Sequence, residues 1–163
     1  MIKLSKKRYK RKRQLKKLKI HSFSNLELWN LDATLARYIA EGLRQYIKSE
    51  RHGFPGKLLP KENPYNPTAE ETQKAVQEWE KILKHMYYAF EQIYLNYPDS
   101  PRELWDKENN DYGRVKINYK THSLDFSEIK EPPQEILDAD HEYYQKIKEG
   151  LQLFAIYFQD LWD

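Results

Sequence analysis

Residues 68–97 read TAEETQKAVQEWEKILKHMYYAFEQIYLNY, and this stretch decides the fold class because it has the signals of a long amphipathic helix. Thr68 and Glu71 have the spacing of a capping box, in which a hydroxyl and a carboxylate satisfy free amides at a helix start. Pro98 ends the pattern. The apolar stripe between these signals consists of Val76, Trp79, Leu83, Met86, Phe90, Ile93 and Tyr97. We predict a helix over this stretch.

Two further stretches predict helices of similar length. The first spans residues 25–50, with a capping box at Ser24 and Glu27 and a second possible start at Asn30. Its stripe is Leu28, Leu31, Leu35, Ile39, Leu43 and Tyr46. The other spans residues 134–161, and its stripe is Ile136, Tyr143, Ile147, Leu151, Phe154 and Phe158.

Gly42 and Gly150 lie inside predicted helices. An interior glycine costs about 1 kcal/mol relative to alanine, so we expect another helix to approach closely at these positions. Trp79 and Phe154 lie in the middle of their stripes and are the expected interior anchors.

The predicted helices are joined by two long connections. Residues 51–67 carry four prolines and two glycines, and this loop is ordered only if Phe54, Leu58, Leu59 and Tyr65 pack onto the body. Residues 98–133 include an alternating segment, residues 114–119, which is compatible with a strand. One strand without a partner makes no sheet, so we expect extended coil there and keep a real sheet as the alternative.

Together these patterns predict a mainly all-α protein. We expect a bundle of three long helices with long ordered loops in residues 21–163, preceded by a basic N-terminal arm in residues 1–20. Aromatic residues make up 14% of the chain, too many for a wholly disordered protein.

Several classes of protein lack support in the sequence. The chain has no cysteine, and no apolar run approaches the ~20 residues of a membrane span, so we expect no disulfide, no thiol catalysis and no membrane association. None of the five histidines follows a glutamate by three positions, and glycine-rich phosphate loops are missing. We expect no metal, no cofactor and no catalytic residue, and therefore no enzyme.

The charge distribution is the most informative feature of the composition. Residues 1–20 hold eleven Lys and Arg and no acid, whereas the other 143 residues hold 17 basic and 25 acidic side chains. A basic arm of this density neutralises phosphates and releases their counterions, which predicts salt-dependent binding of nucleic acid or another polyanion. The predicted nucleic-acid-binding residues are Lys6, Lys7, Arg8, Tyr9, Lys10, Arg11, Lys12, Arg13, Lys16 and Lys17, with Tyr9 offering a ring for base stacking.

Other roles of the arm stay open. It can bind an acidic protein surface, or it can be a solubilising tail that lies on the acidic body. Its apolar residues are too sparse to hold it against a core, so we expect it to be disordered without a partner.

Two weaker patterns concern the body. Asp32, Glu80, Glu91 and Glu149 flank the stripes and either line an acidic cleft or are ordinary surface charges. The thirteen tyrosines, many near helix rims, suggest either a small-molecule pocket or the outer layer of a core.

Three segments together resemble the uncharacterised small helical proteins of tailed bacteriophages and gut viruses. They are residues 21–36, the segment from Trp79 to Glu91, and the ending from Glu149 to Trp162. The resemblance implies a helical protein in the cytoplasm of an infected bacterial cell or in a virion, and it carries over no activity to any position.

The leading hypothesis is a non-enzymatic protein whose arm binds DNA, RNA or a ribonucleoprotein, while the helices supply a scaffold and an oligomer interface. The alternative hypothesis is a counter-defence or regulatory protein. It would bind a host or virion protein, or sequester a small signalling molecule, through its aromatic-lined helices and residues 98–133.

Overall fold

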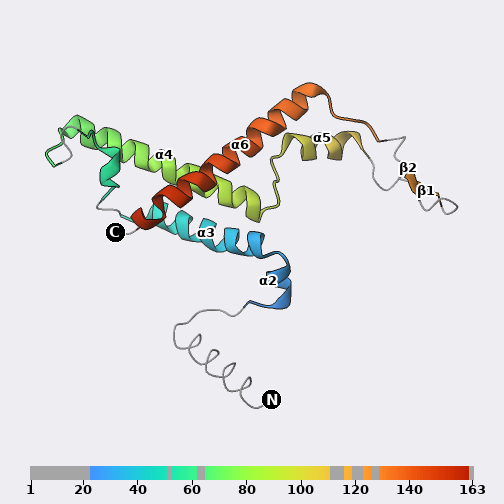
Figure 1. Ribbon diagram of the computed structural model, residues 1–163, viewed down its shortest axis with the longest axis horizontal. Coiled ribbons are helices and arrows are strands. Elements are labelled where there is room, and N and C mark those ends of the chain that lie inside the picture. The colour runs from blue at the N-terminus through green and yellow to red at the C-terminus, as the bar shows by residue number, and fades with distance from the viewer. Residues whose placement is uncertain are drawn as a thin grey trace, which may run out of the picture.

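The computed structural model describes residues 23–50, 53–61, 65–110, 116–118, 123–125 and 129–161, and most of them are helical. The all-α class is thereby confirmed. Helix α4 (Ala69–Tyr94) is the shared element, because α3 (Leu31–Lys48) and α6 (Gln134–Tyr157) both pack against it. Among the described residues, the backbones of α3 and α6 do not approach each other closely. Figure 1 shows α6 crossing α4 on one side and α3 following it on the other.

The first predicted helix is two helices in the structure. Helix α2 (Asn25–Trp29) begins with the expected capping box at Ser24, and α3 begins after a break at Asn30. Asn30 has φ −113° and ψ 57°, which is not helical. The structure therefore contains both predicted helix starts, the first at α2 and the second at α3.

The face of α3 that packs against the body includes Ile39, Leu43 and Tyr46 of the expected stripe but not its first residues. Leu28 on α2, and Leu31 and Leu35 on α3, are exposed, so their prediction as core residues is wrong. The buried positions are Thr34, Ala36, Ala40 and Leu43. Two alanines on this face let the α3 backbone lie close to α4, which a row of leucines would prevent.

Helix α4 has the expected start, since Thr68 and Glu71 form the capping box. Its end comes three residues earlier than predicted, because Asn96 and Tyr97 adopt the left-handed conformation. The Tyr97 amide donates to the Gln92 carbonyl at 2.7 Å and the Asn96 amide to the Ile93 carbonyl at 3.2 Å, the pattern of a Schellman motif.

The connection expected over residues 98–133 contains helix α5 (Pro101–Asn109), which the sequence analysis missed. Ser100 caps it, and Pro101 occupies its first position, where a missing amide costs nothing. The expectation of extended coil is also wrong: β1 (Lys116–Asn118) and β2 (Ser123–Asp125) form an antiparallel pair, with Ile117 opposite Leu124.

The third predicted helix is confirmed as α6, followed by the short 3₁₀ helix η3 (Phe158–Asp160). Lys57, in the 3₁₀ helix η1 (Gly56–Leu58), anchors this end of the chain. Its ammonium group lies 2.6 Å from the Asp160 carboxylate and donates to the Ile156 carbonyl at 3.0 Å. Phe54 and Leu58 also pack onto the core, whereas Tyr65 in the same loop is 98% exposed.

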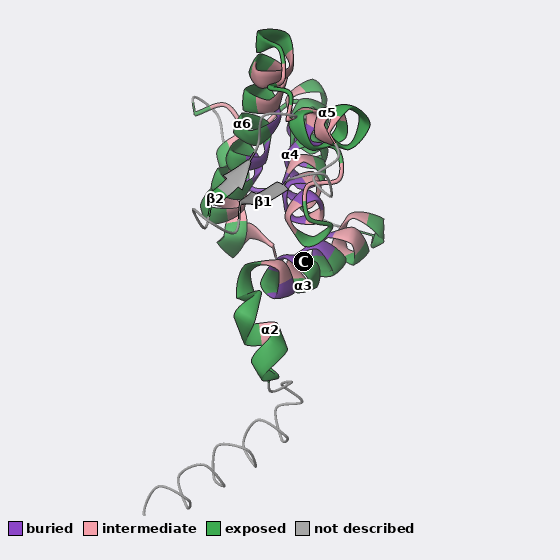
Figure 2. Ribbon diagram, turned by 90° about the vertical axis from the view of Figure 1, so that its right-hand side faces the viewer, coloured by how far each residue is buried: buried purple, intermediate pink, exposed green. Residues whose placement is uncertain are grey.

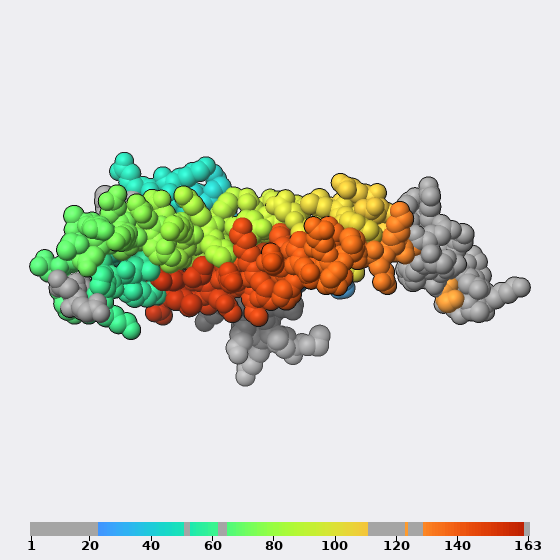
Figure 3. All heavy atoms as spheres, turned by 90° about the horizontal axis from the view of Figure 1, so that it is seen from above, coloured from blue at the N-terminus to red at the C-terminus, as the bar shows by residue number. Residues whose placement is uncertain are grey.

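Two buried clusters share α4. The larger joins α3, α4 and the end of α6 around Trp79, Leu83 and Met86. The smaller joins α4 and α6 through Ala89, Tyr143 and Ile147. Buried residues follow the inner faces of the long helices in Figure 2, and Figure 3 shows α6 beside α4 over the part of the molecule where the two helices overlap.

The two helical glycines differ. A Cβ atom on Gly150 would lie 2.5 Å from the Ala89 Cβ, so the predicted close approach is confirmed there. A Cβ atom on Gly42 would meet nothing within 4 Å, so the same prediction is wrong for Gly42.

Candidate functional site

All ten predicted nucleic-acid-binding residues belong to the arm and lie outside the described residues. The expectation of disorder in the arm also falls outside them. The structure describes the surface formed by the residues that follow, beginning at Phe23.

Helix α2 carries an unusual amount of exposed apolar surface. Leu26 is 76% exposed and Trp29 is 85% exposed, and α2 has no buried residue. The helix is held by local bonds instead: the Glu27 amide donates to the Ser24 hydroxyl, and the Ser24 amide donates to the Glu27 carboxylate at 2.7 Å. Figure 2 shows α2 standing away from the buried interior.

Phe23 connects this region to α3. Its ring meets the ring of Tyr38 edge to face, with 6.3 Å between the centroids. Tyr38 in turn borders a groove between α3 and α4, so one aromatic contact joins Phe23 to that groove.

The α3–α4 groove has a volume of about 440 Å³ and falls in the size range of ligand pockets. It combines aromatic, cationic and anionic side chains. The lining residues are Arg37, Tyr38, Ala40, Glu41, Arg44, Tyr87, Glu91 and Tyr94.

Glu41 is fully engaged by its neighbours on α3. Arg44 grips the carboxylate with two bonds, Nε to Oε2 at 2.8 Å and Nη2 to Oε1 at 2.7 Å, and Gln45 adds a third at 2.6 Å. These hydrogen bonds, that of Arg44 foremost, lower the pKa of Glu41 from 4.5 to about 2. The carboxylate therefore stays ionised at any physiological pH, and its charge is balanced by Arg44.

Glu91, on the α4 side of the groove, accepts a hydrogen bond from the Tyr87 hydroxyl. This bond raises the pKa of Tyr87, so the phenol stays protonated. Both carboxylates of the groove thus have a partner within the groove itself.

The remaining groups of the groove offer stacking surface and one further cation. Tyr38 and Tyr94 are 47% and 42% exposed. The guanidinium carbon of Arg37 lies 5.3 Å from the centroid of the Tyr38 ring. A planar ring with a nearby anionic group is the ligand that such an arrangement suits.

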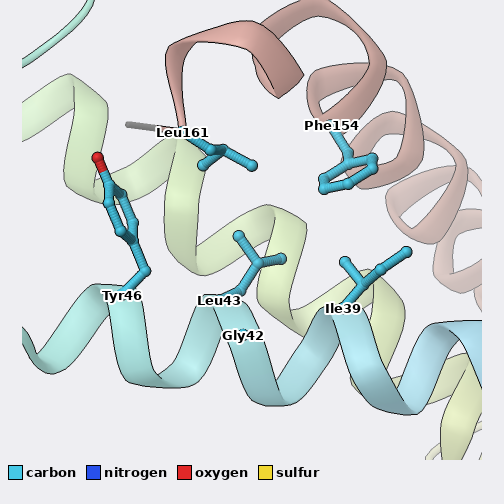
Figure 4. A pocket seen from close by; sticks show the side chains of 6 residues that line it. All are labelled: Ile39, Gly42, Leu43, Tyr46, Phe154 and Leu161. Carbon is cyan, nitrogen blue, oxygen red and sulfur yellow. The ribbon is translucent and has the colours of Figure 1, made fainter. Parts of the chain in front are cut away.

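A second hollow is apolar and lies between α3 and the end of the chain. Its volume is about 270 Å³, and its lining residues are Ile39, Gly42, Leu43, Tyr46, Phe154 and Leu161. In Figure 4, Ile39 and Leu43 rise from α3 towards Phe154 and Leu161 on the opposite side. Gly42 adds no side chain to this hollow, and a Cβ atom built at that position would meet nothing within 4 Å.

The predicted acidic cleft does not form as one site. Glu91 lines the α3–α4 groove, Glu80 lines a separate hollow with Lys84, and Glu149 is exposed on α6. The His85 ring donates from Nε2 to the Lys146 carbonyl oxygen at 2.9 Å and thereby joins α4 to α6. In the part of the chain that the structure describes, no group of three His, Asp or Glu side chains is placed to hold a metal ion.

Sequence reasoning missed the groove residues of α3, namely Arg37, Tyr38, Glu41 and Arg44. Their spacing of three and four residues marks a shared helix face, but it does not show that Tyr87 and Tyr94 of α4 lie opposite. No family model, curated protein or solved structure matches this chain. None of the described helices has the length and apolar character that crossing a bilayer requires.

Proposed function

We propose that this protein binds nucleic acid through its basic N-terminal arm and uses the helical body as a scaffold. The observation that supports this most directly is the segregation of charge, with eleven basic residues and no acid in residues 1–20 and an acidic excess in the remainder. An arm of this kind binds phosphates by counterion release and reads little sequence. The partner is DNA, RNA or a ribonucleoprotein, and the resemblance to phage proteins supports an infected bacterial cell or a virion as the setting.

The test is the salt dependence of binding. Replacing Arg8, Arg11 and Arg13 with Ala should weaken binding of DNA and RNA alike. The slope of log K against log salt should become shallower by up to about three units, because each phosphate of duplex DNA that is no longer neutralised removes about 0.9 from the slope. The measurement is fluorescence anisotropy over a salt series.

A charge-matched control is available on α4. Lys74, Lys81 and Lys84 are exposed and form surface ion pairs with glutamates one helical turn away, and such pairs contribute little to stability. Changing these three lysines to Ala removes the same charge from the body and should leave the slope unchanged. Equal effects of the two triple variants would refute the arm as the binding element.

A second candidate function has its own support, the apolar hollow shown in Figure 4. A hollow lined by Ile39, Leu43 and Phe154 suits an aliphatic or aromatic side chain of a partner protein, as a counter-defence or regulatory protein would need. Deletion of residues 1–20 separates the two functions, because only the nucleic-acid function requires the arm. The readout is a pull-down from infected cells with and without nuclease.

A further inference from the structure

We infer that residues 158–161, at the end of α6, form a lid on the apolar hollow, and that Lys57 holds this lid closed. The inference concerns the hollow of Figure 4, so it rests on the second candidate function and adds how access to the hollow is controlled. It is carried by three features of the described residues: the fixed position of Lys57, its contacts with the end of α6, and the weak packing of the lid itself.

The first feature is the position of Lys57 in η1, on a part of the chain that is fixed to the body. Phe54 and Leu58, which flank it in the sequence, pack against the larger buried cluster, and Pro55 is buried. The Leu58 amide donates to the Pro55 carbonyl at 2.9 Å. The backbone that carries Lys57 therefore has little freedom, and the lid is the partner that can move.

The second feature is the set of contacts that Lys57 makes. Its Nζ atom lies 2.6 Å from the Asp160 carboxylate and donates to the Ile156 carbonyl at 3.0 Å. The same atom lies 4.0 Å from the centroid of the Tyr157 ring. The ion pair, the charge-assisted hydrogen bond and the cation–π contact all depend on the ammonium charge. One charge therefore controls every one of these contacts.

The third feature is the weak packing of the lid. The 3₁₀ helix η3 has no buried residue, and Phe158 is 61% exposed. The Leu161 amide reaches the Phe158 carbonyl at 3.4 Å, which is long for a hydrogen bond. Segments with few buried contacts open at a low cost in free energy. The contacts of Lys57 thus decide how often the lid is closed.

Leu161 connects the lid to the hollow. It directly follows Asp160, the residue that Lys57 pairs with, and its side chain lines the hollow. Figure 4 shows Leu161 and Phe154 on the side of the hollow opposite Leu43. Release of Asp160 would free Leu161 to move away and would make Leu43 and Phe154 accessible to an apolar ligand.

The first measurement is hydrogen exchange on the full-length chain. Lys57→Met removes the charge and keeps an apolar side chain of similar length. The amides of residues 158–161 should then exchange about tenfold faster, because the lid loses the contacts that close it. Amides at the centre of α4 should keep their wild-type rates. Lys57→Arg keeps a cation and should stay within about twofold of the wild type.

The second measurement is binding of the uncharged fluorescent dye N-phenylnaphthylamine, which does not respond directly to a lost charge. Lys57→Met should strengthen dye binding by up to about tenfold, because the apparent affinity follows the fraction of molecules with an open lid. Leu161→Ala removes the side chain that closes the hollow and should also strengthen binding. The double variant should gain little beyond Leu161→Ala, since both changes act on the same site.

Lys74→Met is the matched control. Lys74 forms an exposed ion pair with Glu70 at 2.7 Å on α4, away from the hollow. Its replacement removes the same charge and should change neither the exchange of residues 158–161 nor dye binding.

The outcomes separate the lid from the function of the hollow. If Lys57→Met leaves the exchange of residues 158–161 unchanged, or speeds exchange equally in α4, the lid inference is wrong. If Leu161→Ala strengthens dye binding and Lys57→Met does not, the hollow stands as a binding site and its control by Lys57 is refuted. If the dye binds neither the wild type nor any variant, the hollow and its lid both fail.

Discussion

Gly150 on α6 lies directly against Ala89 on α4, and a Cβ atom built on the glycine would be 2.5 Å from the alanine Cβ. The same atom would lie 2.7 Å from the carbonyl oxygen of His85. The ring of His85 in turn bonds to the Lys146 carbonyl at 2.9 Å, one helical turn before the glycine. This is the crossing point of α4 and α6, and it has no space for a side chain.

Gly150→Ala should therefore lower the stability of the protein, although alanine is the better helix former. The two backbones must separate to admit the methyl group, and overpacking of this kind costs about 1–3 kcal/mol. Urea unfolding measures the change. Gly42→Ala is the control with the opposite sign, because its methyl group meets nothing within 4 Å. It should stabilise the protein by about 0.5–1 kcal/mol, and a loss of stability would mean that α3 packs differently.

Trp79 should be the stronger of the two expected interior anchors. It is 2% exposed and packs against the ring of Tyr157, whereas Phe154 is half-buried and borders the apolar hollow. Trp79→Ala should cost about 3–5 kcal/mol, and Phe154→Ala should cost less, about 2 kcal/mol. Both free energies of unfolding come from denaturant titrations, and the reverse order would contradict this assignment of the core.

The buried phenol of Tyr143 should make the fold sensitive to alkali. Its hydroxyl donates to Gln92 Oε1 at 2.7 Å, and Gln92 Nε2 donates to Asp99 at 2.9 Å. Burial raises the pKa of Tyr143 above its ordinary value of 10.0, with smaller contributions from Tyr88 and Asp99. Above pH 10 the unfolded chain loses this proton first, so stability falls as the pH rises towards the folded pKa.

Tyr143→Phe removes that proton and should flatten the decline in stability between neutral pH and about pH 11. The decline should not vanish, because burial also raises the pKa values of Tyr88 and Tyr144. At neutral pH the variant should lose about 1 kcal/mol, since Gln92 Oε1 loses its donor. Unfolding midpoints over the pH series provide the measurement, and an unchanged slope would show that Tyr143 does not control it.

Asn96 should be replaceable by glycine with a gain in stability. It has φ 61° at the end of α4, where glycine adopts the left-handed conformation without steric cost. We expect Asn96→Gly to stabilise by about 0.5 kcal/mol and Asn96→Ala to destabilise by about 1 kcal/mol. Thermal melts of the two variants test the sign, and a gain with alanine would exclude backbone strain as the cause.

Features that depend on neighbours in the chain could be predicted from the sequence. The capping boxes at Ser24 and Thr68 need only the residue three positions later, and both are present in the structure. The same kind of local signal exists at Ser100, Pro101 and Glu103, so the start of α5 could also have been predicted from the sequence.

Features that depend on which helix faces meet could not be predicted in the same way. Leu28, Leu31 and Leu35 belong to the more apolar stripe, but close packing on α4 selects the face with Ala36, Ala40 and Leu43. The groove could not be predicted for the same reason. Tyr38 of α3 and Tyr94 of α4 line it together only because α3 packs on α4 through this face.

The capping box of α2 follows the arm closely in the sequence, and we expect the two segments to be under different evolutionary constraints. Ser24 and Glu27 bond to each other's backbone amides, so the start of α2 is closed by two residues that lie three positions apart. Binding by counterion release, as proposed for the arm, depends on the total charge of the arm more than on the order of its residues. We expect related chains to change freely in the arm, in order and in length, while positions 24 and 27 keep a hydroxyl or amide and a carboxylate.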